Sequence, residues 1–337
     1  MKQNYPLNDA VCARLGILPT RDVGSLKHGQ ICLANDDLFS QETVQTELTT
    51  FGIGYADPNR NQLMSLLNYF APKRPGPRNV LVTQYDETEP FEAVDPAKVK
   101  RAELGDFHTV KQRSSTKVAR RVINRGLAIV LDNDQLKDKP NWEQMHTMWL
   151  IDLLTRASII EVLALFAAFA PTANLLWNNV NNPDLDINST NIQVLALATG
   201  FKANRACYGE YATLLRRQAY EGSNNPGGYA GAANIDDAAI ATRIGVATSR
   251  TNVERYNQAG VKDTFLGSKV LLYTAIDGES PEDASNVVRH VSNTDLGGEY
   301  SVYVERKLKK TIISVENYEV FATQHTSGAA LLTVRGA

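Results

Sequence analysis

The feature that most constrains the fold is one long segment with the pattern of a helix. It reads NWEQMHTMWLIDLLTRASIIEVLALFAAFA from Asn141 to Ala170, directly after Pro140 and directly before Pro171. Proline is tolerated where a helix begins, Asn141 can cap the helix, and Gln144 stands three residues later, as in a capping box. At 1.5 Å per residue, about 30 residues span roughly 45 Å. A rod of this length predicts an elongated subunit that contacts other copies.

This helix is expected to be covered by other elements. After Ser158 its only charged residue is Glu161, so apolar surface nearly surrounds its second half, and we expect Ile160 to be buried. A membrane span needs about 18 or more uninterrupted apolar residues, and Asp152, Arg156 and Glu161 interrupt this run, which predicts no membrane insertion. The apolar positions that follow the helical period along one face are Leu150, Leu153, Ala157, Ile160, Ala164 and Ala167.

The composition is that of an ordinary globular protein. The 337 residues are 43% hydrophobic and 21% charged, with a formal net charge of -2, which allows one large or two modest domains. A dedicated nucleic-acid-binding domain is usually clearly basic, so this charge argues against that class. The polar start MKQNYPLNDA predicts no signal peptide, and Cys12, Cys32 and Cys207 are too few and too scattered for a disulfide framework. We therefore expect synthesis in a reducing, intracellular compartment.

The first 75 residues are predicted to form an N-terminal arm. They contain only short helical candidates, at Asn8–Leu15, Asp37–Leu48 and Gln62–Phe70. The run APKRPGPRN then places three prolines within nine residues. Such a segment has little hydrophobic surface with which to build a core of its own.

A long polar segment follows between two strand-like stretches. NVLVTQY begins at Asn79 and GLAIVLD ends at Asp132, and about 40 polar residues separate them. A loop of this length is uncommon inside a compact monomer. If it is ordered, something outside the subunit must order it.

The charges of this segment are sorted along its two limbs. Charge complementarity with a neighbouring copy could set its register, at about 0–1 kcal/mol for each exposed pair. The alternatives are a solvated hairpin with incidental charge blocks, and nucleic-acid contact by the basic limb, which nearly lacks aromatic residues for base stacking. The acidic limb contains Asp86, Glu87, Glu89, Glu92 and Asp95, whereas the basic limb contains Lys98, Lys100, Arg101, Lys111, Arg113, Lys117, Arg120, Arg121 and Arg125 against only Glu103 and Asp106.

A small α/β unit is predicted after the long helix. An asparagine-rich loop, WNNVNNPDLDINSTN, leads to a helix near Asn191–Thr199 that Gly200 closes. The strand ANRACYG, the helix EYATLLRRQAY, a glycine-rich loop, a helix from Asp236 to about Gly245 and strands near Ala247–Val253 and at KVLLYTA come next. From about Gly297 the pattern changes to long strands, YSVYVERKLKKTIISVENYEVFAT and GAALLTVRG.

No enzymatic or metal site is predicted. Glu143 and His146 form one half of a di-iron motif whose second copy is missing from the sequence. Cys207 lies between a strand and a helix, but no histidine is near it in sequence, and free cysteines are usually small buried hydrophobes. GSNNPGGYAG lacks the lysine and hydroxyl residue of a phosphate loop. We therefore assign no catalytic, cofactor-binding or metal-binding residue.

The order of these parts resembles a major capsid protein of tailed bacteriophages with the HK97-type fold. The segments that carry the resemblance are KVARRVINRGLAIVLDNDQLKDKPNWEQMHTMWLIDLLTRA, ANRACYGEYATLLRRQAY, KVLLYTAIDGESPEDASNVVRHV and VYVERKLKKTIISVENYEVFAT. The resemblance covers roughly residues 76 to 337. Each segment is weak by itself, and the specificity of the resemblance lies in their order and spacing.

The resemblance implies an α+β fold and a division of the chain. Residues 1–75 would form the N-terminal arm and 76–125 an extended β-hairpin loop that reaches over an adjacent subunit. Residues 126–190 and 291–337 would form a peripheral domain with a spine helix at 141–170, and residues 191–290 an axial domain.

The resemblance also implies a function without an active site. The chain would assemble with itself, as pentamers and hexamers, into an icosahedral virion shell made in the host bacterial cytoplasm. The shell would enclose double-stranded DNA by non-specific contact, without a membrane, a cofactor or a metal, and scaffold, portal and decoration proteins are the further partners left open. The alternative is an encapsulin-like cellular nanocompartment shell. Some relatives cross-link a loop lysine to a neighbour's asparagine, but we interpret Lys98, Lys100 and Lys111 as solvated charges.

Overall fold

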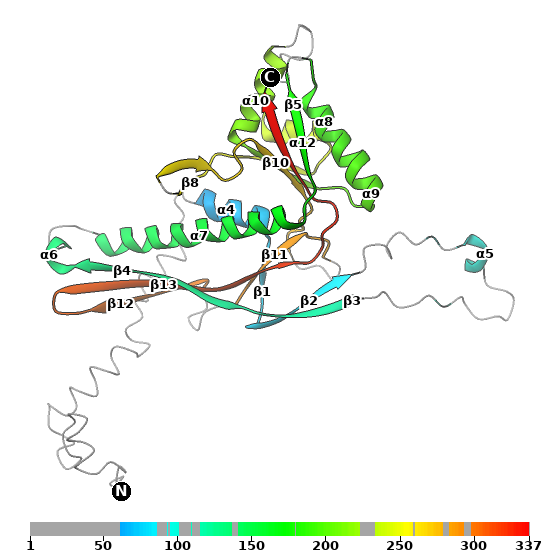
Figure 1. Ribbon diagram of the computed structural model, residues 1–337. Coiled ribbons are helices and arrows are strands. Elements are labelled where there is room, and N and C mark those ends of the chain that lie inside the picture. Colours follow the sequence, from blue (N-terminus) through cyan, green and yellow to red (C-terminus); the bar gives the residue numbers. More distant parts are fainter. Residues whose placement is uncertain are drawn as a thin grey trace. The chain divides into compact units, whose positions relative to one another are not determined.

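The computed structural model describes residues 61–85, 93, 95–100, 109, 115–136, 141–178, 180–222, 233–258, 260–278, 283–292 and 298–336. The chain divides into two compact units, and Figure 1 labels the helices and strands that are named below. The first unit contains residues 1–55, 126–151 and 294–317, and the second contains residues 56–125, 152–293 and 318–337. The second unit includes the short helix α5 (Pro96–Val99), and the first unit includes the short helix α6 (Asn133–Leu136).

A five-stranded sheet forms the centre of the second unit, in the order β5-β14-β10-β6-β7. β10 runs antiparallel to β14 and to β6, whereas the pairs β14–β5 and β6–β7 are parallel. Every residue of β6 is buried, because this strand lies inside the sheet and both of its faces are covered. The bounds are β5 Thr172–Trp177, β6 Arg205–Gly209, β7 Thr248–Asn252, β10 Lys269–Tyr273 and β14 Ala330–Gly336.

Helices pack against both faces of this sheet. On one face, α4 (Asn61–Phe70) and the second part of α7 (Trp142–Phe169) share a core with Cys207, Leu271 and Tyr273. On the other face, α8 (Pro183–Ser189), the π-helix η4 (Thr190–Ala196), α10 (Glu210–Glu221) and α12 (Asp237–Ile244) pack against strand residues such as Tyr208 and Leu272. The sheet is therefore the middle layer of the unit.

α10 begins where two backbone segments approach closely. A Cβ atom built on Gly209 would lie 2.1 Å from the carbonyl oxygen of Gly267, which is far too close for any side chain. Gly267 itself has a φ of 56°, in the left-handed region that favours glycine. The pair allows the end of β6 to pass directly beside the turn that precedes β10.

α8, η4 and α9 (Leu197–Thr199) are consecutive in the chain, from 183 to 199. Asn182 caps the start by accepting a hydrogen bond from the Leu185 N–H at 3.2 Å, and Gly200 ends α9 with a φ of 78°. Ile187, Asn191 and Leu195 recur at every fourth position and are all buried. Four residues are slightly more than one turn of an α-helix and slightly less than one turn of a π-helix. A stretch that combines both kinds of turn therefore keeps these three side chains on one side.

The start of α8 differs from our prediction of a continuous asparagine-rich loop. α8 begins inside WNNVNNPDLDINSTN, because Asn182 is a capping residue and Pro183 occupies the first helical turn. The predicted helix near Asn191–Thr199 is confirmed, and it continues α8.

The first unit contains the ladder between β12 (Tyr300–Arg306) and the first half of β13 (Lys310–Thr323). These strands pair antiparallel, from Tyr300 opposite Asn317 to Arg306 opposite Thr311. β4 (Ile123–Asp132) also pairs with β13. The Thr311 hydroxyl lies 2.7 Å from Oδ1 of Asn133, which ties the chain after β4 to this ladder.

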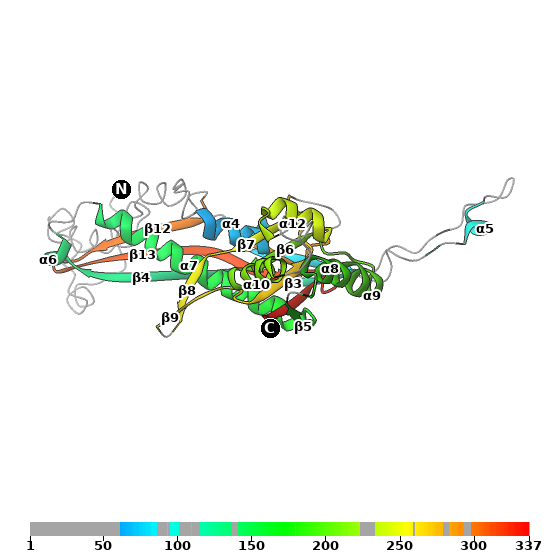
Figure 2. The ribbon, with the colours of Figure 1, turned by 90° about the horizontal axis from the view of Figure 1, so that it is seen from above.

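The second half of β13 belongs to the second unit. There it pairs antiparallel with β11 (Val287–Val291), and β11 pairs in parallel with β1 (Lys73–Pro75). A separate short hairpin consists of β8 (Arg255–Gln258) and β9 (Val261–Thr264) (Figure 2).

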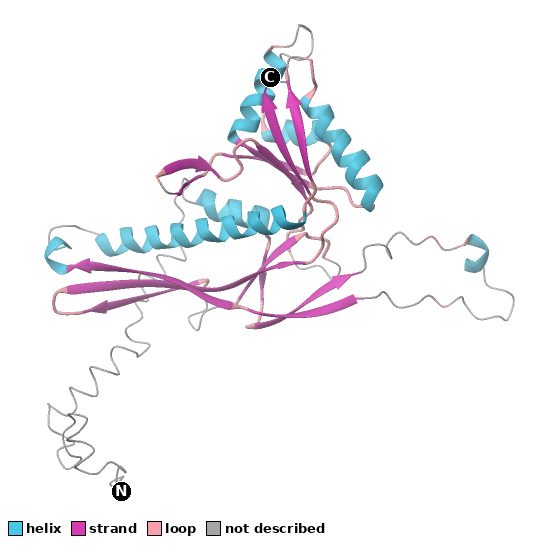
Figure 3. Ribbon diagram, viewed as in Figure 1, coloured by secondary structure: helices cyan, strands magenta, loops and turns pink. Residues whose placement is uncertain are grey.

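The long helix predicted at 141–170 is confirmed, and α7 is one unbroken helix (Figure 3). Asn141, directly before it, has a φ of 57°, a conformation that asparagine tolerates better than most residues. Among the described helices, none is long and apolar enough to cross a membrane.

The prediction that Ile160 is buried was wrong. Ile160 is 46% exposed, whereas the preceding Ile159 is 0% exposed. Ala157, Ala164 and Ala167 of the predicted face are exposed too. The helix is apolar nearly all round, so its sequence pattern could not identify the buried side. The side chains that it buries in the second unit include Leu154, Ser158, Ile159, Val162 and Phe166.

The described end of the predicted arm is also different from an extended segment. The helix predicted at Gln62–Phe70 is confirmed as α4, but Leu66, Leu67 and Phe70 are fully buried in the core of the second unit. β1 then adds a strand beside β11. An amphipathic helix buries its apolar stripe where a sheet offers a matching face, and this tertiary contact was not visible in the local sequence. The candidates Asn8–Leu15 and Asp37–Leu48 lie outside the described residues.

The sheet topology groups strands that we had assigned to different domains. β5 and β14, from the predicted peripheral domain, pair with each other, and β14 also pairs with β10 of the predicted axial domain. The division into peripheral and axial domains stays a prediction.

Candidate assembly surface

The β2–β3 hairpin is the described part of the predicted extended loop. β2 (Asn79–Tyr85) and β3 (Ser115–Arg121) pair antiparallel, from Asn79 opposite Arg121 to Tyr85 opposite Ser115. The strand predicted at NVLVTQY is confirmed, and β3 is a strand that we had left inside the polar stretch. Its sequence STKVARR has too little alternation to be recognised alone.

The inner face of this hairpin is attached to the second unit. Val82 is buried against Val288 and Ala322, and Val80 packs at the edge of the same cluster. The Gln84 side-chain amide donates a hydrogen bond to the Thr323 carbonyl oxygen at 3.2 Å. These contacts join β2 to β11 and to the second half of β13, so the root of the loop has a defined position on its own subunit.

The outer face of the hairpin is open. Directly opposite residues of an antiparallel pair share a face, so Leu81, Lys117 and Arg121 all lie on the side away from Val82. All three are exposed, and neither cation pairs with a carboxylate among the described residues. This face presents an apolar side chain between two uncompensated positive charges.

A buried charge cluster, which we call the root cluster, holds the chain where it leaves the hairpin. Arg125, near the start of β4, forms an ion pair with Glu161 of α7 and lies 3.5 Å from Oε1 of Glu319. The Ser158 hydroxyl donates a hydrogen bond to that same oxygen, and Nη1 of Arg289 lies 3.5 Å from Oε2. The side chains of Glu319 and Arg289 are 1% and 0% exposed. A charge buried this deeply requires its partners, so the root cluster ties Arg125 to α7 and β13.

Tyr318 adds a second anchor beside the root cluster. The guanidinium of Arg78, just before β2, lies 4.6 Å from the centre of the Tyr318 ring. The Asn124 amide donates to the Tyr318 hydroxyl at 3.2 Å, and the Val122 N–H donates to the Arg78 carbonyl at 2.8 Å. Both limbs of the loop therefore leave the subunit from one fixed place.

Most of the charges predicted to recognise a neighbour lie outside the described residues. Of the acidic limb only Asp95 is described, and it is exposed. Lys117, Arg120 and Arg121 of the basic limb are exposed on β3, and Lys100 is exposed as well. Charge complementarity between the limbs of two copies stays a prediction. The predicted positions outside the described residues are Asp86, Glu87, Glu89, Glu92, Arg101, Glu103, Asp106, Lys111, Arg113 and the side chain of Lys98.

The other residues considered for chemistry have structural partners. Oε1 of Glu143 accepts a hydrogen bond from Arg306 at 2.6 Å. Cys207 is fully buried in the sheet, and burial raises the pKa of its thiol, which keeps it protonated. Most of the glycine-rich loop lies outside the described residues. Among the described residues, no group of three or more histidine, cysteine, aspartate or glutamate side chains is placed to bind a metal.

The sequence did not reveal the root cluster. Arg125 was counted only as one of nine basic charges, and Glu319, Ser158 and Arg289 lie far from it in the chain. Ser158 in the apolar second half of α7 was a signal that could have marked a buried polar cluster, whereas Glu319 is one of several polar residues of β13 and gave none.

Neither a protein-family model nor a curated protein matches this sequence. Among solved structures, a phage-related protein from Bordetella bronchiseptica RB50 is 14% identical, with a TM-score of 0.60 over 86% of this chain and 96% of that chain. The mature capsid of bacteriophage PhiM1 is 9% identical, with a TM-score of 0.47 over 80% and 86%. The virus-like particle of Pyrococcus furiosus is 10% identical, with a TM-score of 0.43 over 83% and 100%.

The first of these similarities shows a shared fold. At 14% identity it carries no further conclusion, and the two scores below 0.5 add no argument. The mixed α and β fold predicted from the sequence is confirmed, and this fold is shared with the phage-related protein.

Proposed function

We propose that this chain is a major capsid protein that assembles with copies of itself into the closed shell of a tailed bacteriophage. The observation that carries the proposal is the anchored β2–β3 hairpin. Its root is buried and charge-paired within the subunit, whereas its outer face presents Leu81 between Lys117 and Arg121 without a partner among the described residues. A segment held this firmly at one end and unmatched on its outer face is suited to binding another molecule.

The fold supports a structural role over an enzymatic one. The side chains with candidate chemistry, Glu143 and Cys207, are used for an ion pair and for core packing. We further propose that copies form pentamers and hexamers that enclose double-stranded DNA, and that assembly takes place in the host cytoplasm. The proposals about pentamers and hexamers, enclosed DNA and the place of assembly rest on the resemblance of the sequence to phage capsid proteins.

Assembly is tested by expressing the full chain and examining it by electron microscopy and sedimentation. We expect closed particles of uniform size. A chain that stays a monomer or a small oligomer at high concentration would contradict the proposal. Enclosed DNA would favour a virion shell, whereas co-purification of one cargo enzyme would favour the nanocompartment alternative.

The role of the loop that joins β2 to β3 is tested by removing it. Tyr85 and Ser115 are directly opposite each other, so residues 86–114 can be replaced by Asn-Gly, which closes a two-residue hairpin turn. The root contacts would remain, and we expect a folded subunit that forms no particles. The matched control replaces residues 86–114 with a Gly-Ser linker of equal length, which separates loop length from loop sequence.

A further inference from the structure

A short strand, β1, holds the start of the β2–β3 hairpin on the sheet. β1 pairs in parallel with β11, with Arg74 opposite His290, and only residues 76–78 separate β1 from β2. The Gly76 N–H donates a hydrogen bond to the Val291 carbonyl oxygen at 3.0 Å. β1 therefore links the sheet to the hairpin on which the proposed function depends.

His290 lies on the side of the sheet that receives this hairpin. Residues two apart in a strand face the same side, so His290 faces the same way as Val288, which packs against Val82 of β2. His290 is 8% exposed, and its Nε2 atom has no hydrogen-bond partner among the described residues. In a neutral ring this nitrogen can be the unprotonated one, whereas a protonated ring carries an N–H there that needs an acceptor. The site therefore suits the neutral ring.

A buried cation lies beside His290. Residues in register on neighbouring strands face the same side, so the side chains of Arg74 and His290 are neighbours. Nη2 of Arg74 donates to Oδ2 of Asp283 at 2.6 Å and to the Ile276 carbonyl oxygen at 2.8 Å, and Nε donates to the same Asp283 oxygen at 3.1 Å. The side chains of Arg74 and Asp283 are both nearly buried. One carboxylate is thus already committed to one cation.

The other elements around His290 add cations on this side of the sheet. Arg120 of β3 lies opposite Val80, which packs on the same side as Val82. The charged residues next to His290 and its strand neighbours, Lys73, Arg289 and Glu319, are one position away and face the other side. Around His290, the charged or titratable side chains described on its own side are Arg74, Arg78, Arg120, Tyr318 and Asp283. Asp283 is the one carboxylate among them.

We propose that protonation of His290 opens the pairing of β1 with β11 and releases the start of the β2–β3 hairpin. This pH switch rests on the proposed function, because the anchor that opens is the one that holds the assembly hairpin. Protonation places a second positive charge beside Arg74 and an N–H at Nε2 without an acceptor among the described residues. The cost of both is removed when β1 moves away and the ring reaches water.

The direction of the switch follows from linkage. Burial and, after it, the charge of Arg74 lower the pKa of His290 below 6.5 while β1 is paired, against the opposite effect of Asp283. The opened site lacks these two effects, so it binds the proton more readily than the closed site. The switch is therefore closed at neutral pH and opens as the pH falls through the lowered pKa.

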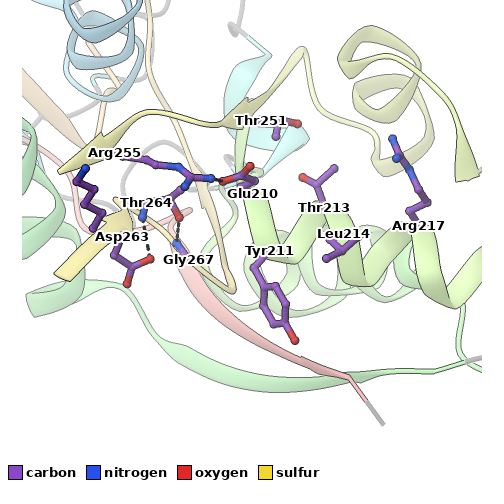
Figure 4. A pocket seen from close by; sticks show the side chains of 11 residues that line it. Glu210, Tyr211, Thr213, Leu214, Arg217, Thr251, Arg255, Asp263, Thr264 and Gly267 are labelled. Carbon is purple, nitrogen blue, oxygen red and sulfur yellow. Dashed lines mark hydrogen bonds and ion pairs between the residues drawn. The ribbon is translucent and has the colours of Figure 1, made fainter. Parts of the chain in front are cut away.

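Hydrogen–deuterium exchange of the full chain at pH 8 and pH 5 tests the switch. After correction for the intrinsic pH dependence of exchange, peptides that cover β1 and β2 should exchange at least about 10-fold faster at pH 5, because one unit of difference in pKa changes the equilibrium tenfold. Peptides from α10 are the internal reference and should keep their protection. α10 and the β8–β9 hairpin line a hollow of about 600 Å³ that contains the Arg255–Glu210 ion pair but no histidine (Figure 4).

His290→Asn is the matched control, because asparagine is polar, smaller than histidine and does not titrate. Peptides of β1 and β2 in this variant should exchange equally at the two pH values. Two results would overturn the inference: a natural chain whose β1 and β2 peptides are equally protected at pH 8 and pH 5, or an acid response that persists in His290→Asn. An equal acid response in α10 would also overturn it, because the opening would then be global.

Exchange in unassembled subunits requires no particles, so the switch and the proposed function can fail separately. A chain that forms no particles contradicts the proposed function, and its β1 peptides still show or lack the acid response. Where particles form, those of His290→Asn should dissociate at a lower pH than those of the natural chain. Particles of both chains that dissociate at the same pH would show that His290 does not control the assembly hairpin.

Discussion

The inward and outward sides of α7 in the second unit differ greatly in exposure but little in polarity. The inward side packs Ile159, Val162 and Phe166 into the core and also buries the hydroxyl of Ser158. The outward side shows Ala157, Ile160 and Ala164 to the surface of the subunit. Both sides are apolar by composition.

The difference between them is one of size and tertiary partners. Large side chains face the sheet, where they fill space against Tyr273 and the residues of α4, and mostly small ones face outward. A helix that is apolar all round therefore does not reveal its buried side. Which side of the helix is buried depends on the shape of the surface against which the helix packs.

The difference between the two sides of α7 is tested by placing the same charge on each side. Ile159→Arg would bury an unpaired guanidinium and should cost more than about 4 kcal/mol, a large part of a total stability of about 5–15 kcal/mol. Ile160→Arg should cost about 1 kcal/mol or less, because the side chain can reach water. Urea denaturation of both variants measures the difference. Equal losses would show that the outward side is not exposed in the subunit.

In the root cluster, a buried carboxylate can be compared with a partly exposed one. Arg125 pairs with the buried Glu319 and with Glu161, whose side chain is 44% exposed. Glu319→Ala should cost about 3–5 kcal/mol, because it removes the carboxylate beside the fully buried Arg289. Glu161→Ala should cost about 0–1 kcal/mol. Urea midpoints provide the measurement, and a larger loss for Glu161→Ala would reverse the assignment of the anchor.

The acidic limb has no large apolar face, so we expect its charges to affect assembly more than the stability of the subunit. Changing Asp86, Glu87, Glu89, Glu92 and Asp95 to lysine should shift the free energy of unfolding by about 1 kcal/mol or less and should block particle formation. Neutral amides at the same five positions are the control and should weaken assembly less. Variants that fail to fold would contradict the view that this limb adds little to its own subunit.

The smallest expected effect concerns His290 of β11, which faces inward. Burial lowers the pKa of His290 below its ordinary value of 6.5, the positive charge of Arg74 lowers it further, and Asp283 partly opposes the shift. The unfolded chain therefore binds this proton more readily than the folded chain does. The contribution of the neutral histidine is complete above about pH 6.5 and is lost as the pH falls through the lower, folded pKa.

Urea midpoints between pH 8 and pH 5 test this effect. We expect a decline on the acidic side for the natural chain and a flatter profile for His290→Asn. Identical profiles would show that His290 does not contribute.

Much of the fold could be predicted from local sequence. β2 has the predicted bounds of NVLVTQY, and α10 and α12 begin and end within one or two residues of the predicted segments. These elements have strong local signals, such as the cap at Asp236 and the glycine at Gly245. The order of the parts was sufficient to predict the fold class.

The rest depends on contacts between residues far apart in the chain. α4 enters the core because a sheet face formed by Cys207 and Leu271 receives it, and nothing near residue 66 encodes that face. The candidate assembly surface, too, could be predicted only in part. The sorting of charge along the loop can be read from the sequence, whereas the pairing of Arg125 with Glu319 requires the folded sheet.

The close approach of Gly209 and Gly267 has a consequence for detecting distant relatives. Apolar core positions can exchange leucine, valine and isoleucine at little cost, so their identities drift quickly. A side chain at Gly209 would collide with backbone, which cannot move aside as a side-chain tip can. Chains that keep this crossing should keep a glycine at each of the two positions, even where overall similarity has faded. The pair then serves as a compact signature for finding such chains by sequence.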